Sequence, residues 1–201
     1  MRKLTYFVAV SVDGFIGDES GDGTMFMSFV DEEFLAFLKA EYPETVPAEG
    51  RKMVGLDGVA NKKFDTVIQG RGSYQVGIDA GVLSPYGHLR EYVVSRSLDT
   101  SPHPNVELIR DDVVGKVREL KAESGNGSGI WLCGGAQVAG LLADEIDELV
   151  IKTYPVVLGA GMPMFAGRGY DLARFELEEN RTFGNGVVVR RYSRAGGRDH
   201  A

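Results

Sequence analysis

Short apolar runs along the chain predict strands that are buried within a sheet. The first run, residues 4–12, is apolar and β-branched without a break, which is typical of a strand covered on both faces. Further short strands are predicted by residues 66–69, 92–95, 106–109 and 130–133.

Helices are predicted by apolar positions at helical spacing. In residues 31–41, Phe34 and Phe37 fall on one face, and acidic residues in the first turn suit the positive end of the helix dipole. Asp112 is placed to cap a helix that runs to about residue 124, because a short acceptor side chain satisfies free backbone N–H groups there. A shorter helix is predicted over residues 136–143.

The last part of the chain predicts antiparallel strands. Residues 148–158 predict a strand that is bent or at an edge near Pro155, since proline lacks a backbone N–H. Residues 175–183 and 186–193 are joined by a glycine-rich turn and predict a hairpin. Residues 43–63 are mixed and polar, and predict a long loop with one short helical turn.

The alternation of strands and helices predicts an α/β fold with helices on the faces of a sheet. The terminal hairpin adds antiparallel strands at one edge. No repeat or linker divides the chain, so we expect a single domain over residues 1–194, and a disordered polar tail over residues 195–201.

Composition and charge exclude several classes of protein. The formal net charge is −7, from 22 basic and 29 acidic residues, which argues against a general nucleic-acid binder. No apolar run has the length of a membrane span and no secretory signal is evident, so we expect no membrane association and a cytoplasmic location. The single cysteine, Cys133, and three widely spaced histidines predict no internal disulfide and no metal site.

The junctions after three of the predicted strands, two of them glycine-rich, are the candidate binding elements. Gly70-Arg71-Gly72-Ser73 and Gly134-Gly135 follow two strands, and Ser95-Arg96 ends a third. Backbone N–H groups at such junctions bind phosphate, and arginine suits phosphate recognition. For one junction alone, a tight turn is the simpler interpretation, but the set together suits a dinucleotide.

Ordered motifs in the chain resemble those of the dihydrofolate reductase fold. They are Val8 to Gly17, Ile68 to Tyr74, Val93 to Ser97 and Cys133 to Val138. Within this fold, Ser11-Val12-Asp13-Gly14 and the run Pro155 to Phe165 are most similar to the reductase half of the bifunctional riboflavin-biosynthesis deaminase–reductase and its stand-alone relatives. The resemblance implies a mostly parallel, mixed central sheet of about eight strands, flanking helices and bound NADPH.

The resemblance also assigns expected roles to residues of this chain. Ala9 and Ile16 would flank the nicotinamide, and Ser95 and Arg96 would hold the adenosine 2′-phosphate. The pyrophosphate would lie between two junctions. These are Gly70, Arg71, Gly72 and Ser73 on one side, and Cys133, Gly134, Gly135, Ala136, Gln137 and Val138 on the other.

Acidic residues are the candidates for catalysis. Dihydrofolate reductases use one acid of the first long helix, and the candidates here are Asp31 and Glu33, with Phe34 aligned at the acid's own position. Asp13 is a further candidate, or a turn residue before a glycine. In the riboflavin branch a lysine usually lies four residues before the serine of the Ser11 motif, where this chain has Phe7.

Three functions follow as hypotheses from the resemblance. The first is an NADPH-dependent reductase of a pteridine- or pyrimidine-like heterocycle, of the 5-amino-6-(5-phosphoribosylamino)uracil reductase type. The second is a dihydrofolate reductase, and the third is a non-catalytic NADP-binding protein. The expected partners are a small heterocyclic substrate and a second copy of the chain, in a homodimer that edge strands near the C-terminal hairpin would form.

Overall fold

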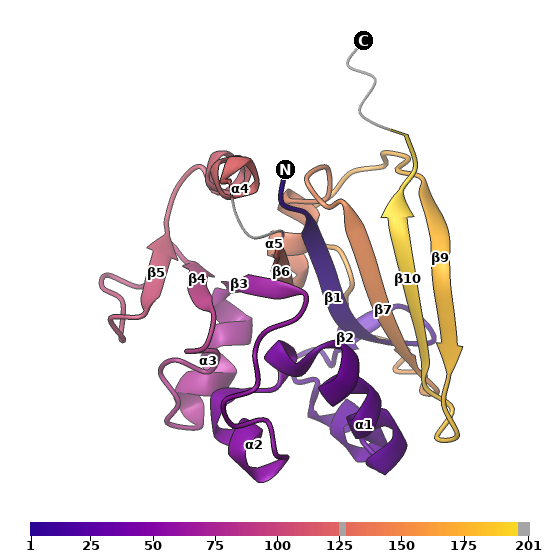
Figure 1. Cartoon of the computed structure of the whole chain (residues 1–201). Helices are drawn as coiled ribbons and strands as arrows, with labels where there is room; N and C mark the ends of the chain where they lie inside the picture. Colours follow the sequence, from indigo (N-terminus) through magenta and orange to yellow (C-terminus); the bar gives the residue numbers. More distant parts are fainter. Residues whose placement is uncertain (125–127, 197–201) are drawn as a thin grey trace.

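A mixed eight-stranded sheet forms the centre of the computed structural model, which describes residues 1–124 and 128–196 (Figure 1). Six neighbouring strands are parallel, and a C-terminal hairpin adds two antiparallel strands at one edge. In spatial order the strands are β5 (Val106–Ile109), β4 (Arg90–Val94), β3 (Phe64–Gly70), β6 (Gly129–Gly134), β1 (Leu4–Ser11), β7 (Glu148–Tyr154), β10 (Val188–Arg194) and β9 (Phe175–Thr182).

The predicted α/β fold with a terminal hairpin is confirmed, while the bounds of several elements shift by one to four residues. The strand expected over residues 148–158 ends at Tyr154, directly before Pro155. Proline cannot donate a ladder hydrogen bond, so the pairing of β7 with β1 and β10 stops there.

Successive side chains of β1 enter two different cores, which explains why its sequence is largely apolar. Leu4, Tyr6 and Val8 belong to one buried cluster, whereas Phe7 belongs to the other. Because side chains alternate across a strand, a strand inside a covered sheet needs mostly apolar residues on both faces, and the polar Thr5 and Ser11 of β1 are buried as well.

The helices cover both faces of this sheet. Helices α4 (Val113–Ala122) and α5 (Ala136–Leu141) pack on the face of Leu4, while α1 (Glu32–Glu41) packs on the face of Phe7. Helix α3 (Arg71–Asp79) places Tyr74 against β4 and β5. The expected cap is present, since Asp112 accepts from the Gly115 N–H at 3.0 Å, and the Asp31 carboxylate caps α1 in the same way by accepting from the Phe34 N–H at 2.8 Å.

Residues 43–63 are more ordered than their composition predicts. They form the 3-10 turn η2 (Pro43–Thr45) and helix α2 (Ala48–Met53). Glu44 is fully buried, and its carboxylate accepts from the backbone N–H groups of Lys62, Lys63 and Phe64 at 2.7–3.2 Å. The Glu44 side chain therefore joins the beginning of this segment to the start of β3, and the buried Arg51 holds its middle by donating to the carbonyls of Pro43, Leu56 and Val59.

Two small elements complete the fold. A 3-10 turn, η1 (Thr24–Phe29), and a two-stranded sheet of β2 (Phe15–Gly17) and β8 (Met162–Pro163) follow the ends of β1 and β7. In the described ranges, every helix is too short or too polar to pass through a bilayer. The tail predicted to be disordered lies, from residue 197 onward, outside the described residues.

We expect Glu44→Ala to destabilise the protein by about 2–4 kcal/mol, because three backbone N–H groups lose a charged acceptor and a buried void is left. Urea unfolding followed by circular dichroism measures this change. The control is Glu41→Ala, since Glu41 is 48% exposed and 3.9 Å from Lys63, and should cost less than about 1 kcal/mol. Equal losses in the two variants would contradict the role given to Glu44.

Candidate cofactor groove

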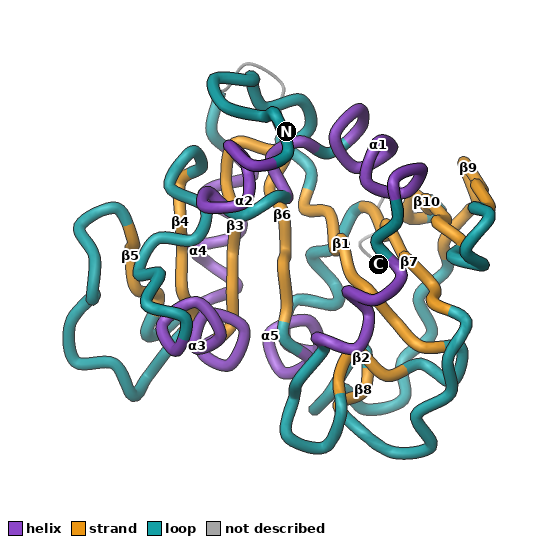
Figure 2. The backbone as a smooth tube through the Cα atoms, turned by 90° about the horizontal axis from the view of Figure 1, so that it is seen from below, coloured by secondary structure: helices purple, strands orange, loops and turns teal. Residues whose placement is uncertain are grey.

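A long groove of about 1710 Å³ follows the carboxyl ends of β1, β3, β4 and β6. Figure 2 shows α3 and α5 starting at the same end of the neighbouring strands β3 and β6, with the small sheet of β2 and β8 at that end too. Parallel strands place their carboxyl ends at one edge, where α/β folds bind ligands. All residues that the sequence predicted for the cofactor line this one groove, from Ala9 to Val138.

The two glycine junctions touch each other at the middle of the groove. A methyl group at Gly70 would lie 3.1 Å from the Gly135 nitrogen and 3.1 Å from Val138 Cγ2. Gly134 has φ +134°, a conformation that disfavours side chains, and the Gly134–Gly135 peptide is cis. Neither α3 nor α5 begins with a capping side chain. The junction therefore exposes backbone where a flat or charged ligand can approach closely.

Two arginines at the groove carry positive charge that no carboxylate neutralises within the described ranges. Arg71 begins α3 and is partly buried, and Arg96 follows β4 and is exposed. Ser95 shapes the loop around Arg96, since its buried hydroxyl accepts from the Leu98 N–H at 3.1 Å. Guanidinium groups without a carboxylate partner, beside the exposed backbone N–H groups of the glycine junctions, form a chemically suitable site for phosphate.

Other residues that line the groove were not predicted from the sequence. Arg110 follows β5 directly, and its guanidinium donates to the Asp99 carbonyl. The rule that ligands meet the carboxyl ends of parallel strands could have found it. The acidic groups of the groove, for which the sequence gives no signal, are Glu19, Asp22, Asp79, Asp111 and Asp112.

Cys133 lines the groove as a neutral thiol. Burial raises the pKa of Cys133 to about 11, against the smaller opposing effects of the Lys152 charge and a hydrogen bond with Tyr86. A thiol with this pKa is protonated at neutral pH and is a poor nucleophile. The cysteine therefore contributes shape to the groove.

The three carboxylates predicted for catalysis lie outside the groove, one in the loop after β1 and two at the start of α1. Asp13 accepts from the Gly159 N–H at 2.7 Å and from the Ser11 hydroxyl at 2.6 Å. Asp31 caps α1, and Glu33 accepts from the Gly184 N–H at 3.1 Å. None of them lines the groove. Each binds backbone or a neighbouring side chain, and a catalytic role for each stays a prediction.

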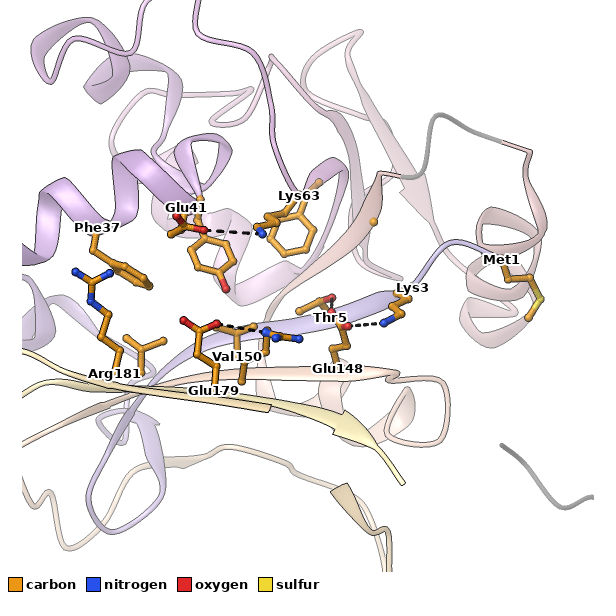
Figure 3. A pocket seen from close by; sticks show the side chains of 15 residues that line it. Met1, Lys3, Thr5, Phe37, Glu41, Lys63, Glu148, Val150, Glu179 and Arg181 are labelled. Atoms are coloured by element: carbon orange, nitrogen blue, oxygen red, sulfur yellow. Dashed lines mark hydrogen bonds and ion pairs between the residues drawn. The ribbon is translucent and has the colours of Figure 1, made fainter. Parts of the chain in front are cut away.

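A second cavity, of about 470 Å³, lies between α1 and strands β1, β7, β9 and β10 near the amino end of β1 (Figure 3). Its charged groups pair with one another, as the dashed lines show for Lys63–Glu41, Lys3–Glu148 and Arg191–Glu179. Arg181 covers the ring of Phe37 at 5.0 Å. This cavity thus offers a ligand less uncompensated charge than the groove does.

The sequence matches the RibD C-terminal domain family over residues 2–189. The chain therefore belongs to this family, as the motifs predicted. Two proteins of Bacillus subtilis (strain 168) are similar along most of their length. Uncharacterized protein YwjB is 30% identical over 94% of this chain and 96% of its own, and uncharacterized protein YyaP is 24% identical over 93% and 92%.

Solved structures share the fold at low sequence identity. A protein from Shewanella sp. PV-4 assigned to riboflavin biosynthesis superposes with a TM-score of 0.68 at 23% identity, covering 98% of this chain and 100% of that one. The diaminohydroxyphosphoribosylaminopyrimidine deaminase/5-amino-6-(5-phosphoribosylamino)uracil reductase of Thermotoga maritima gives 0.61 at 17% identity, covering 96% of this chain and 57% of that one. Dihydrofolate reductase from Enterococcus faecalis, complexed with NADP(H) and RAB-propyl, gives 0.62 at 15% identity, covering 96% and 97%. These similarities confirm the dihydrofolate reductase-like fold.

We expect Gly70→Ala to destabilise the protein by about 1–3 kcal/mol, because the added methyl group pushes the two junctions apart. Gly72→Ala is the matched control, since a methyl group there meets nothing within 4 Å and alanine favours a helix. Its stability should equal or slightly exceed that of the wild type in urea unfolding. The contact between the junctions is refuted if both variants unfold at the same urea concentration.

Proposed function

We propose that this protein is an oxidoreductase that uses NADPH to reduce a small heterocyclic compound. The observation that carries the proposal is the groove, where two mutually contacting glycine junctions lie beside the unpaired Arg71 and Arg96. Membership of the RibD C-terminal domain family supports a reductase, since the Thermotoga relative of the fold is named as one.

The residues of the groove suit a dinucleotide with an additional phosphate. Gly70, Gly134 and Gly135 leave backbone open where a pyrophosphate needs close approach. Arg96 lies in the loop after β4, held by Ser95, where it would bind the adenosine 2′-phosphate that distinguishes NADPH from NADH. Ala9 and Ile16 also line the groove and would flank the nicotinamide.

The chain's own groups position the reactants and exclude water. NADPH supplies the hydride when it is bound. Arg71 and Arg96 would hold its phosphates, while apolar side chains such as Ile16 and Phe26 line the wall of the same groove. Fixing both reactants in such a site lowers the entropic part of the barrier.

A pyrimidine of the 5-amino-6-(5-phosphoribosylamino)uracil type is the preferred substrate, ahead of dihydrofolate. At the helix position where the resemblance expects an acid, Phe34 is fully buried and packs edge-on against Phe183, with ring centroids 5.0 Å apart. No carboxylate occupies that position, which disfavours a dihydrofolate reductase. A protein that binds NADPH and reduces neither compound would match the third hypothesis, a non-catalytic binding protein.

We expect NADPH to raise the melting temperature much more than NADH does in a thermal-shift titration, because ligands that bind the native state stabilise it. Arg96→Ala should weaken NADPH binding about tenfold to hundredfold and leave NADH binding unchanged. The control is Arg118→Ala, an arginine of α4 that is 62% exposed and lies outside the groove. No stabilisation at millimolar NADPH would overturn the proposal, and an unchanged preference in Arg96→Ala would overturn the assignment of the 2′-phosphate. NADPH oxidation in the presence of the uracil or of dihydrofolate then separates the three hypotheses.

We also propose that two copies of the chain form a homodimer through the edge strand β9. Seven of its eight residues are exposed, among them Leu177 at 57%, and within the described part of the chain its backbone pairs with β10 alone. An uncovered edge strand presents unpaired backbone groups that a second copy can satisfy. Light scattering at micromolar concentration should give twice the chain mass of 21.8 kDa, and Leu177→Arg should shift it toward the monomer. A monomeric wild type would overturn this assignment.

A further inference from the structure

Polar side chains interrupt the apolar face of the sheet beside the groove. Gln69 on β3, Cys133 on β6 and Lys152 on β7 lie near the carboxyl ends of their strands, and β1 contributes the small Ala9 between the last two. Strand alternation puts Gln69 on the same face as Val67, which belongs to the aromatic cluster of Phe7. These polar groups therefore share one face with buried aromatic rings.

Lys152 is an ammonium group without a charged partner. Its Nζ lies 4.1 Å from the centroid of the Phe7 ring, and within the described ranges it makes no hydrogen bond or ion pair. Burial lowers the pKa of Lys152 to about 8. A partly buried cation that only an aromatic ring compensates is costly to the fold, which points to a role in binding a ligand.

The groove and Lys152 have neighbours in common. Lys152 pairs in register with Ala9, and its charge acts on the Cys133 thiol; both of these residues line the groove. Two residues further along β7, the ring of Tyr154 packs at a tilt against that of the groove residue Phe26, with centroids 4.7 Å apart. Lys152 is not itself a lining residue of the groove; it lies directly beside the lining residues Ala9 and Cys133, at the end where Ala9 would meet the nicotinamide.

Gln69 is a second polar group on this face with an unmet hydrogen bond. It is only 2% exposed, and its Nε2 has no partner among the described residues. Buried amide N–H groups are almost always satisfied in folded proteins, and each orphan needs an explanation. A ligand that accepts hydrogen bonds from this face would satisfy both Gln69 and Lys152.

We propose that Lys152 binds the substrate of the reductase and donates the proton that accompanies hydride transfer. The inference rests on the proposed function. The substrate class is a heterocycle with electron-rich ring atoms that face the cation and with a C=N bond to be reduced. In a ribosylamino compound this bond forms when the C1–O bond of the sugar ring breaks and the N–H proton passes to the ring oxygen. Hydride adds to the carbon and leaves the electron pair on nitrogen. The ammonium of Lys152 gives that nitrogen one proton, and the neutral amine recovers a proton from water.

The charge state of this face near pH 8 depends on Lys152. The titratable groups beside it are Cys133, Tyr86 and Tyr154, and burial raises the pKa of each well above that range. The other side chains that meet Lys152 are apolar: Phe7 and Ala9 from β1, and Val189 from β10. Donation needs the protonated amine, so activity should fall as pH rises through about 8.

Amine labelling, which needs no substrate, tests whether a small molecule can reach Lys152 through the groove. At pH 7.5 about a quarter of an amine with this lowered pKa is neutral, against about one in a thousand for an ordinary lysine. Trinitrobenzenesulfonate, a flat anionic reagent, should therefore modify Lys152 before the exposed Lys3, as measured by peptide mass spectrometry. If Lys3 reacts first, the amine is closed off from ligands and the proposal is overturned.

Steady-state kinetics with 5-amino-6-(5-phosphoribosylamino)uracil test the chemical role. Lys152→Met should lower kcat/KM at least a hundredfold, while the stabilisation by NADPH stays as in the wild type. Lys152→Arg keeps the charge but gives up no proton near neutral pH, so KM should recover, kcat should stay low, and the fall above pH 8 should disappear. Lys3→Met serves as the control with wild-type kinetics.

The outcomes separate this inference from the proposed function. If NADPH stabilises Lys152→Met normally and its kcat/KM equals that of the wild type, Lys152 has no part in the reaction and the reductase assignment stands. If NADPH fails to stabilise the wild type, the reductase assignment fails, and the proton-donor role fails with it. Loss of NADPH binding in Lys152→Met in proportion to its activity would mark a structural role and also overturn the proposal.

Discussion

The close approach of two backbone turns is the constraint on which the groove depends. Gly70 and the Gly134–Gly135 pair belong to adjacent parallel strands, and no side chain separates them. Because β3 and β6 turn into helices at the same level, both helices start at one edge of the sheet. The guanidinium of Arg71 and the loop of Ser95 and Arg96 then face the same space.

Charge is distributed unevenly over this acidic chain. The net charge is −7, yet the groove holds Arg71 and Arg96 without carboxylate partners in the described ranges, while the acids of the second cavity pair with their own cations. A composition average therefore says little about the local potential that a phosphate meets. Positive charge left unpaired is informative because exposed carboxylates are abundant in this protein.

Much of the fold and of the groove was predictable because local chemistry decides it. The apolar run of β1, the cap at Asp112 and the turn of the hairpin each have a cause within a few residues. Residues 43–63 were not predictable, since their order depends on Glu44 reaching the start of β3. A role for Lys152 was not predictable either, because it depends on contacts with Phe7 and Cys133, which lie on other strands.

The exposed carboxylate of Asp13 joins the loop after β1 to the loop after β7, and both loops lead into the small sheet of β2 and β8 beside the groove. Its hydrogen bond from the Ser11 hydroxyl, aided by the backbone N–H groups of Gly159 and Leu158, holds the pKa of Asp13 below its usual value. A carboxyl with a lowered pKa favours the folded loops above its ordinary pKa and loses that effect only as pH falls through the lowered value. The hydrogen bonds that Asp13 makes between the two loops at the rim of the groove therefore do not change with pH across the neutral range. They weaken only in strong acid, where the carboxylate becomes protonated.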